Sequence, residues 1–269
     1  MLGLPYSAGG FEIMKNNRRT FIKLAGLAAA GLAIAPKAMA SSGGHSPVKP
    51  HAEGFHGKHW AMVIDTTKLH DEEEIAKLAH VCHSLHNVPE AKGKKEIKWI
   101  WSDEYEHTFP EQENPHMSEE VHHRDFVLMC NHCEHPPCVR VCPTKATYKR
   151  PDGIVAMDYH RCIGCRYCMA GCPFGARSFN WGEPRKNLDL TKLNPEYPTR
   201  MRGVVEKCNF CVERLSVGKI PACAEASEGA MIFGDLADPE SEVRKVLRER
   251  FTIRRKPAAG TEPSVYYII

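Results

Sequence analysis

The sequence predicts an α+β fold made of two small, repeated cysteine-rich modules with loop insertions. The main observation is that two runs of four cysteines follow one another in the middle of the chain, and each run ends in Cys-Pro. A second is the segment 147–157, in which short strand-forming stretches flank Pro151-Asp152-Gly153, a hairpin signal. A third is Trp60–Asp65, an apolar run of strand length. We also expect each Cys-Pro to open a short helix, because proline is favoured in the first helical turn.

Length and charge limit the functions that need to be considered. The chain has 269 residues, enough for one large or two small domains with a buried core. Its formal net charge is +3, and no block of lysine or arginine forms a binding stripe. We therefore expect no nucleic-acid partner.

The spacing of the cysteines indicates what they bind. The two runs are Cys130-x2-Cys133-x4-Cys138-x3-Cys142-Pro143 and Cys162-x2-Cys165-x2-Cys168-x3-Cys172-Pro173. The second run has the spacing of ferredoxins, in which three cysteines hold one 4Fe-4S cluster and the fourth ligates the other cluster. Short loops suit this role because their backbone N–H groups can point at the sulfurs. The sequence thus predicts two ferredoxin-like iron-sulfur modules.

A third block is similar to these runs but is one cysteine short. It contains Cys208, Cys211 and Cys223, and the recurring pattern Cys-x3-Cys-Pro-x-x-Ala becomes Cys223-x3-Ser227-Glu-Gly-Ala. Ahead of the two runs there is a single cysteine, Cys82. Ser227 therefore marks the place of a missing ligand.

The N-terminus carries a predicted export signal. Arg18-Arg19 precedes an apolar run over residues 24–35, and the Ala-Met-Ala at residues 38–40 provides the small residues of a cleavage site. The arginine pair predicts a twin-arginine signal, so residues 1–40 are interpreted as this signal with an upstream extension. The apolar run is too short to anchor the chain in a bilayer about 30 Å thick. We expect a linker over residues 41–58 and a periplasmic mature protein.

Disulfides and zinc are the alternative uses of the cysteines. An exported chain with twelve cysteines could form disulfides, but a disulfide network does not need loops of this spacing. A Cys-x2-Cys pair alone is common in zinc sites, which take four ligands in a tetrahedron. Two consecutive four-cysteine runs that end in Cys-Pro favour iron-sulfur clusters over both.

The motifs resemble those of a known family. Residues 130–143, 161–168, 205–208 and 260–267 are similar to segments of the DMSO-reductase and polysulfide-reductase electron-transfer subunits. These are four-cluster iron-sulfur subunits that serve molybdopterin oxidoreductases and quinone-linked membrane complexes. The resemblance covers roughly residues 60–269.

The resemblance implies that the motifs pair crosswise and that the chain holds three 4Fe-4S clusters. The implied ligand sets are Cys130, Cys133, Cys138 and Cys172; Cys142, Cys162, Cys165 and Cys168; and Cys82, Cys208, Cys211 and Cys223. A fourth cluster would need three cysteines within residues 69–77 and one at position 227, where none is present. We interpret this as the loss of one whole cluster, with an ordinary polar helix start in place of its loop.

Alternatives remain for individual residues. His70 or Asp71 could replace cysteine as a ligand, as histidine does in Rieske centres. Cys82 could be a free thiol, which would leave a three-iron cluster on the third block. Other histidines are interpreted as solvated faces, namely His80, His83, His86, His122 and His123. The basic residues beside cysteines would raise cluster potentials or serve solvation and docking; they are Arg161, Arg166, Arg177 and Lys207.

The motifs also suggest domain boundaries. We expect residues 59–124 to form the N-terminal part of one module, with a degenerate first motif and an insertion. Residues 125–182 would form the module of the second and third motifs, and residues 183–235 would complete the other module with the fourth motif. Residues 236–269 would be a C-terminal extension that contains a helix over residues 238–249.

The predicted function is electron transfer rather than catalysis. The sequence shows no nucleophile with its base, open-coordination metal site or nucleotide loop. Within the family, the pattern most resembles DsrO, the exported ferredoxin-like subunit of the sulfite-reduction-associated DsrMKJOP complex. This implies an NrfD-like (DsrP-like) integral membrane subunit and a multihaem (DsrJ-like) cytochrome c as partners, which would hold the protein at the membrane. The alternatives are a subunit of a periplasmic molybdopterin oxidoreductase or hydrogenase, and a zinc-stabilised exported binding module.

Overall fold

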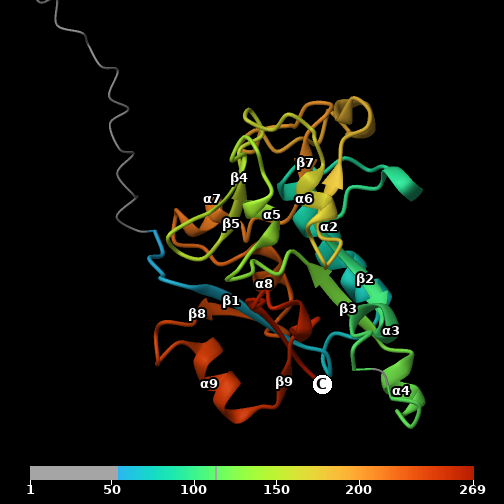
Figure 1. Ribbon diagram of the computed structural model, residues 1–269, viewed down its shortest axis with the longest axis vertical. Coiled ribbons are helices and arrows are strands. Elements are labelled where there is room, and N and C mark those ends of the chain that lie inside the picture. The colour runs from blue at the N-terminus through green and yellow to red at the C-terminus, as the bar shows by residue number, and fades with distance from the viewer. Residues whose placement is uncertain (1–53, 113) are drawn as a thin grey trace, which may run out of the picture. The chain divides into compact units, whose positions relative to one another are not determined.

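The strand predicted at Trp60–Asp65 is confirmed, and it lies inside a four-stranded mixed sheet. The structure, a computed structural model, describes residues 54–112 and 114–269 (Figure 1). The predicted export signal and most of the predicted linker lie outside the described residues. In the part of the chain that is described, no helix is both long and apolar enough to cross a membrane.

Most elements are short, and loops connect them. The helices are α2 (Glu72–Leu85), η1 (Gly93–Lys95), α3 (Tyr105–Thr108), α4 (Glu119–His122), α5 (Pro137–Arg140), α6 (Tyr167–Ala170), η2 (Pro184–Asn187), α7 (Val212–Leu215), α8 (Ala222–Ala226), α9 (Glu242–Glu249) and η3 (Pro257–Ala259). The strands are β1 (Trp60–Asp65), β2 (Ile100–Glu104), β3 (Asp125–Met129), β4 (Thr147–Lys149), β5 (Val155–Met157), β6 (Ser178–Phe179), β7 (Val205–Glu206), β8 (Met231–Asp235), β9 (Thr252–Ile253) and β10 (Val265–Ile268). This mixture of helices and strands agrees with the predicted α+β class.

The four-stranded sheet has the order β8-β1-β10-β9. β1 pairs antiparallel with β8, where Met62 lies opposite Phe233, and parallel with β10, where Val63 lies opposite Tyr266. β10 comes from the predicted C-terminal extension. That segment is therefore part of the sheet.

Both faces of β1 are covered, because side chains along a strand alternate between the two faces. Met62 and Ile64 belong to the main core, whereas Ala61 and Val63 pack in a second cluster with Val243 of α9. All six residues of β1 are buried. Figure 1 shows α9 beside β8 and β1.

Three two-stranded antiparallel sheets complete the fold: β2 with β3, β4 with β5, and β6 with β7. The predicted hairpin is confirmed in β4 and β5, which pair Tyr148 with Ala156. Gly153 in its turn has φ +83°, a left-handed conformation that glycine adopts without steric cost. A third core cluster, which contains Val155 and Val205, lies between this hairpin and β7.

The expectation that Cys-Pro opens a helix is wrong. The short helices α5 and α6 come before the two Cys-Pro pairs and carry the third cysteine of each run. After the proline, Lys145 and Gly175 occupy equivalent positions with φ 55° and 64°. A left-handed residue at that point ends any right-handed helix, so each proline leads into a turn.

The polar helix start predicted within residues 69–75 is confirmed as the beginning of α2. Asp71 caps it by accepting a hydrogen bond from the Glu73 backbone N–H at 3.0 Å, and three glutamates follow in the first turn. Its buried residues Ile75, Leu78 and Cys82 lie on one face because of their helical spacing. The predicted C-terminal helix begins later than expected, at Glu242, since the Ser241 hydroxyl caps it.

Candidate metal centres

The structure gathers the twelve cysteines into three groups of four free thiols. Two groups each line a small cavity: the Cys130 group consists of Cys130, Cys133, Cys138 and Cys172, and the Cys162 group of Cys142, Cys162, Cys165 and Cys168. In the third, the Cys208 group, the Cys82 thiol lies near the thiols of Cys208, Cys211 and Cys223. The cysteines thus meet in the crosswise sets that the resemblance implies.

Each of these two groups takes one cysteine from the other run, and this distinguishes the arrangement from a simple zinc site. Cys142 comes from the first run but lies with the second, and Cys172 comes from the second but lies with the first. Two-cluster ferredoxins exchange ligands in this way. Four cysteines line each cavity, and neither lining includes a histidine, aspartate or glutamate, which suits iron-sulfur clusters.

A recurring backbone conformation shapes three Cys-x2-Cys loops, those that begin at Cys130, Cys162 and Cys208. The residue before the second cysteine is left-handed in each: His132 has φ 42°, Gly164 has φ 70° and Phe210 has φ 55°. Two of these residues are not glycine, and such conformations persist only where the surrounding structure holds them. Successive N–H groups in turns of this kind can form concave sites for anions, which is the character of a sulfur-rich cluster.

Arg177 provides a buried positive charge between two cysteine groups. Its side chain lines the cavity of the Cys130 group, it is 5% exposed, and its Nη2 atom has no hydrogen-bond partner among the described residues. Burial lowers the pKa of Arg177, but the neighbouring Cys138, Cys130 and Cys168 raise it, and the net shift is upward. A buried cation with a free donor beside four thiols fits an anionic cluster.

Lys207 is the second buried cation. Its ammonium donates hydrogen bonds to the carbonyl oxygens of Val155 and Cys208. By contrast, Arg161 and Arg166 are exposed. The four basic residues singled out in the sequence therefore divide into a buried pair near the sulfurs and an exposed pair.

Burial controls the acidity of the thiols in the absence of iron. Burial, followed by repulsion from neighbouring cysteines, raises the pKa of Cys82, and burial raises that of Cys223 to about 11. Cys142 differs: burial raises its pKa, but hydrogen bonds from Thr147 and Thr144 outweigh this effect and lower it. Because thiolate is the form that binds metal, iron binding must displace protons from the buried thiols.

His86 is not solvated, contrary to the sequence interpretation. It is fully buried; its Nδ1–H donates to the Cys82 carbonyl oxygen at 2.7 Å and lies 3.6 Å from the Cys82 sulfur. Its Nε2 lies 2.7 Å from a carboxylate oxygen of Glu213. Glu213 and Cys211 complete a close cluster with His86. The spacing Cys82-x3-His86 on one helix could have revealed this contact.

The other histidines of α2 differ from His86. His80 is exposed, and His83 is half-buried with its pKa lowered to about 4, mainly by burial. His123 is exposed as expected, and it pairs with Glu119 at 3.2 Å.

The Cys130 group is a neighbour of both other groups. The Cys138 thiol is close enough to influence the pKa of Cys168, and the Cys130 thiol influences that of Cys208. The three groups are therefore connected as neighbours through the Cys130 group.

Ser227 faces the start of α2 across a hollow of about 390 Å³, which is also lined by Leu69, Glu74, Lys77 and Leu78. The Ser227 hydroxyl donates to the Ala224 carbonyl at 2.8 Å and accepts from the Met231 N–H at 2.9 Å. The two segments that would have supplied a fourth cluster are thus adjacent. In this position Ser227 ends α8 and joins it to β8.

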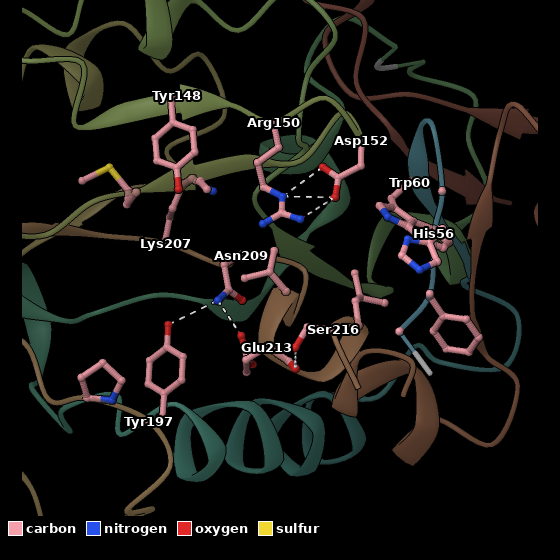
Figure 2. A pocket seen from close by; sticks show the side chains of 18 of the residues that line it. His56, Trp60, Tyr148, Arg150, Asp152, Tyr197, Lys207, Asn209, Glu213 and Ser216 are labelled. Atoms are coloured by element: carbon pink, nitrogen blue, oxygen red, sulfur yellow. Dashed lines mark hydrogen bonds and ion pairs between the residues drawn. The ribbon is translucent and has the colours of Figure 1, made fainter. Parts of the chain in front are cut away.

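A larger cavity, of about 500 Å³, lies beside the loop that carries Cys208 and Cys211 (Figure 2). Its polar groups mostly bind one another. The Asn209 amide donates to Tyr197 and Glu213, and Arg150 pairs with Asp152 at 2.9 Å. Since Glu213 also holds His86, this network supports the position of Cys82.

Fold and cysteine geometry together define a ferredoxin-like iron-sulfur protein, and comparisons specify its family. Residues 122–187 match the family described as 4Fe-4S dicluster domain. The chain is 41% identical over 275 residues to Hdr-like menaquinol oxidoreductase iron-sulfur subunit 1 of Archaeoglobus fulgidus, covering 93% of this chain and 97% of the relative. It is 36% identical over 237 residues to the iron-sulfur cluster-binding subunit of menaquinone reductase from Nitratidesulfovibrio vulgaris, covering 78% and 88% of the two chains. It is also 36% identical over 190 residues to protein NrfC of Escherichia coli, covering 70% and 71%.

The chain belongs to the family of iron-sulfur electron-transfer subunits of redox complexes that contains these relatives.

Proposed function

We propose that this protein carries three 4Fe-4S clusters and relays electrons between a quinone-linked, NrfD-like membrane subunit and a second redox partner. Export by the twin-arginine route and a periplasmic location are part of the proposal. The names of two relatives, a menaquinol oxidoreductase subunit and a menaquinone reductase subunit, support the link to quinone.

The single observation that carries the proposal is the set of three neighbouring cysteine groups. Clusters held only by thiolates exchange single electrons and leave no coordination position open for a substrate. The protein itself supplies the ligands, the buried cations Arg177 and Lys207, and a shell that keeps most of the sulfurs from water. We propose the twelve cysteines as the iron ligands.

The hollow beside Ser227 supports three clusters rather than four. Leu69 and Leu78 line it where three ligands would be needed, and the Ser227 hydroxyl is engaged with backbone groups. The position of His86 also supports Cys82 as a ligand, because its N–H lies beside that sulfur and its partner Glu213 lies two residues beyond Cys211.

Iron analysis combined with EPR of the reduced protein tests this proposal. We expect about twelve iron atoms per chain, since each cysteine group takes four. Sixteen would contradict the loss of a cluster, and about eleven would indicate a three-iron cluster on the Cys208 group. Zinc in place of iron, with no visible absorption, would favour the binding-module alternative.

The type of complex is a finer part of the proposal. The missing cluster, together with the predicted export signal, favours a DsrO-like subunit of a sulfite-reduction-associated complex, with DsrP-like and DsrJ-like partners. Co-purification from detergent-solubilised membranes tests it. Recovery of an NrfD-like subunit with a multihaem cytochrome c is the expected result.

A subunit of a molybdopterin oxidoreductase or hydrogenase is the second candidate. Similarity to the selenate reductase B subunit of Mesobacillus selenatarsenatis, 46% over 154 residues, favours this alternative. That match covers 52% of this chain and 53% of the relative. Recovery of a molybdopterin subunit in the same co-purification would replace the DsrO-like assignment.

A further inference from the structure

The Cys162 group is closer to solvent than the Cys208 group. Cys142, Cys162 and Cys165 are half-buried, whereas all four members of the Cys208 group are buried. Ile163 lines the cavity among these cysteines and is itself 67% exposed. The site therefore lies just beneath the surface at Ile163.

Large exposed apolar side chains gather around the same loop. We call them the Ile163 surface, and they are Val141, Ile163, Tyr167, Trp181 and Met201. Exposed apolar residues scattered singly need no explanation, but a group of them beside a functional site indicates an interaction surface.

Close backbone and ring contacts make this surface continuous. The Arg166 guanidinium lies over the Trp181 ring, 4.6 Å from its centroid. A Cβ atom on Gly164 would collide with the Gly203 carbonyl oxygen, so the loop after Met201 abuts the cysteine loop. On the other side, Val141 packs against the end of α6, where a Cβ on Gly171 would lie 3.3 Å from Val141 Cγ2.

The rim of the Ile163 surface is basic. Five exposed cationic residues lie within or next to its segments: Arg140, Lys145, Arg161, Arg166 and Arg202. Arg161 pairs with Asp158 at 3.2 Å, and none of the other four forms an ion pair within residues 54–112 and 114–269. Arginines elsewhere on the surface, such as Arg185 and Arg214, do have carboxylate partners. The rim therefore carries an excess of positive charge.

On the basis of the proposed function, we propose that the Ile163 surface is where a redox protein docks to exchange an electron with the Cys162 group. The docking face of that partner is apolar at its centre and acidic around it, because complementary charge steers and orients such encounters. A lipid surface fits less well. The Arg166 guanidinium covers one face of Trp181. Inserting this ring into the apolar phase of a membrane would therefore bring a charged group with it.

Electron transfer to two soluble acceptors of opposite charge tests the docking surface. The iron-loaded full chain is reduced with dithionite, freed of excess reductant by anaerobic gel filtration, and mixed by stopped flow with one of two acceptors: the haem domain of cytochrome b5, which is acidic, or mitochondrial cytochrome c, which is basic. In each reaction a ferric haem gains the one electron that the reduced protein loses. For the wild type we expect the rate constant with cytochrome b5 to fall steeply as ionic strength rises.

Two variants probe the surface, and each has a matched control elsewhere. We expect Ile163→Glu and Arg202→Glu to slow the reaction with cytochrome b5 about tenfold or more at low ionic strength, by loss of steering. Arg202→Glu should also speed the reaction with cytochrome c. Phe251→Glu and Lys245→Glu, at exposed positions near and on α9, should leave both rates unchanged. Iron content and the EPR spectrum must match the wild type in every variant.

The possible outcomes separate the docking surface from the proposed function. If all variants react with both acceptors like the wild type, the docking surface is wrong while the electron-transfer function stands. If the iron-loaded wild type reduces neither acceptor, the proposed function fails. Binding to phosphatidylglycerol vesicles that Ile163→Glu abolishes, with an unchanged cytochrome b5 rate, would overturn the protein partner in favour of a lipid surface.

Discussion

The imidazole of His132 stacks on the ring of Phe210, with centroids 3.7 Å apart and planes inclined by 20°. Both residues precede the second cysteine of a Cys-x2-Cys loop, and both are left-handed. His132 belongs to the loop of the Cys130 group and Phe210 to that of the Cys208 group. The stack therefore joins two neighbouring cysteine groups directly.

Replacing Phe210 with alanine tests the importance of this contact. Phe210 is 1% exposed, so we expect Phe210→Ala to lower the free energy of unfolding by about 3–5 kcal/mol, through loss of a buried aromatic ring. Denaturant unfolding of the iron-loaded protein measures this loss, and EPR measures the magnetic coupling between clusters. Phe251→Ala, at an exposed position, is the control. Unchanged stability and coupling in Phe210→Ala would contradict a joining role for the stack.

Ser227→Cys should not restore a fourth cluster. The remaining three ligands would have to come from the start of α2, which Asp71 caps as an ordinary helix. We expect the iron content to stay at about twelve per chain, since each group takes four irons. A rise to about sixteen would show that the hollow beside Ser227 can still hold a cluster. Cys223→Ser, which removes a proposed ligand, should lower the iron content and serves as the comparison.

Arg177→Met should lower the reduction potential of the neighbouring clusters. Reduction adds negative charge, and the buried guanidinium favours it more than a neutral side chain does. We expect a fall of at least about 59 mV, which corresponds to one tenfold change in a one-electron equilibrium. An EPR-monitored redox titration measures it. Arg161→Met, at an exposed residue paired with Asp158, should change the potential little, and equal shifts in the two variants would contradict the special role of Arg177.

Removal of iron should reveal differences in reactivity among the thiols. Thiolate is the reactive form, and the lowered pKa and partial exposure of Cys142 provide more of it than the raised pKa of buried Cys223. After chelation under reducing conditions at about pH 8, we expect iodoacetamide to label Cys142 well before Cys223. Peptide mass spectrometry resolves the two sites. Equal rates would show that the hydrogen bonds to Cys142 are not kept without iron.

Turn residues predicted the hairpin around Gly153, an apolar run predicted the strand Trp60–Asp65, and a polar start predicted the helix that begins beyond Asp71. These features depend on local periodicity and turn residues, which a single sequence shows directly. The three cysteine sets came from the family resemblance, and the structure places their members together.

Other features depend on contacts that the sequence does not display. His86 looks like a surface residue of an amphipathic helix until Glu213, far along the chain, pairs with it. The left-handed conformations of His132 and Phe210 were also unexpected, since neither residue favours them and each is held by the loop around it. Short helices were expected after the two Cys-Pro pairs, whereas they lie before them, around Cys138 and Cys168. The turn that follows each proline was not recognised in the sequence.

The position of β10 has a consequence for how the protein is made. β10 lies between β1 and β9, so the first and last strands of the described chain are hydrogen-bonded neighbours. Such a sheet has a high contact order, and it cannot close before β10 has been synthesised. The Thr261 hydroxyl, just ahead of β10, lowers the pKa of Cys133, although burial has the larger, opposite effect. The segment ahead of β10 also bonds to the backbone just after Cys133, so a truncation that removes β10 would disturb both the sheet and the Cys130 group.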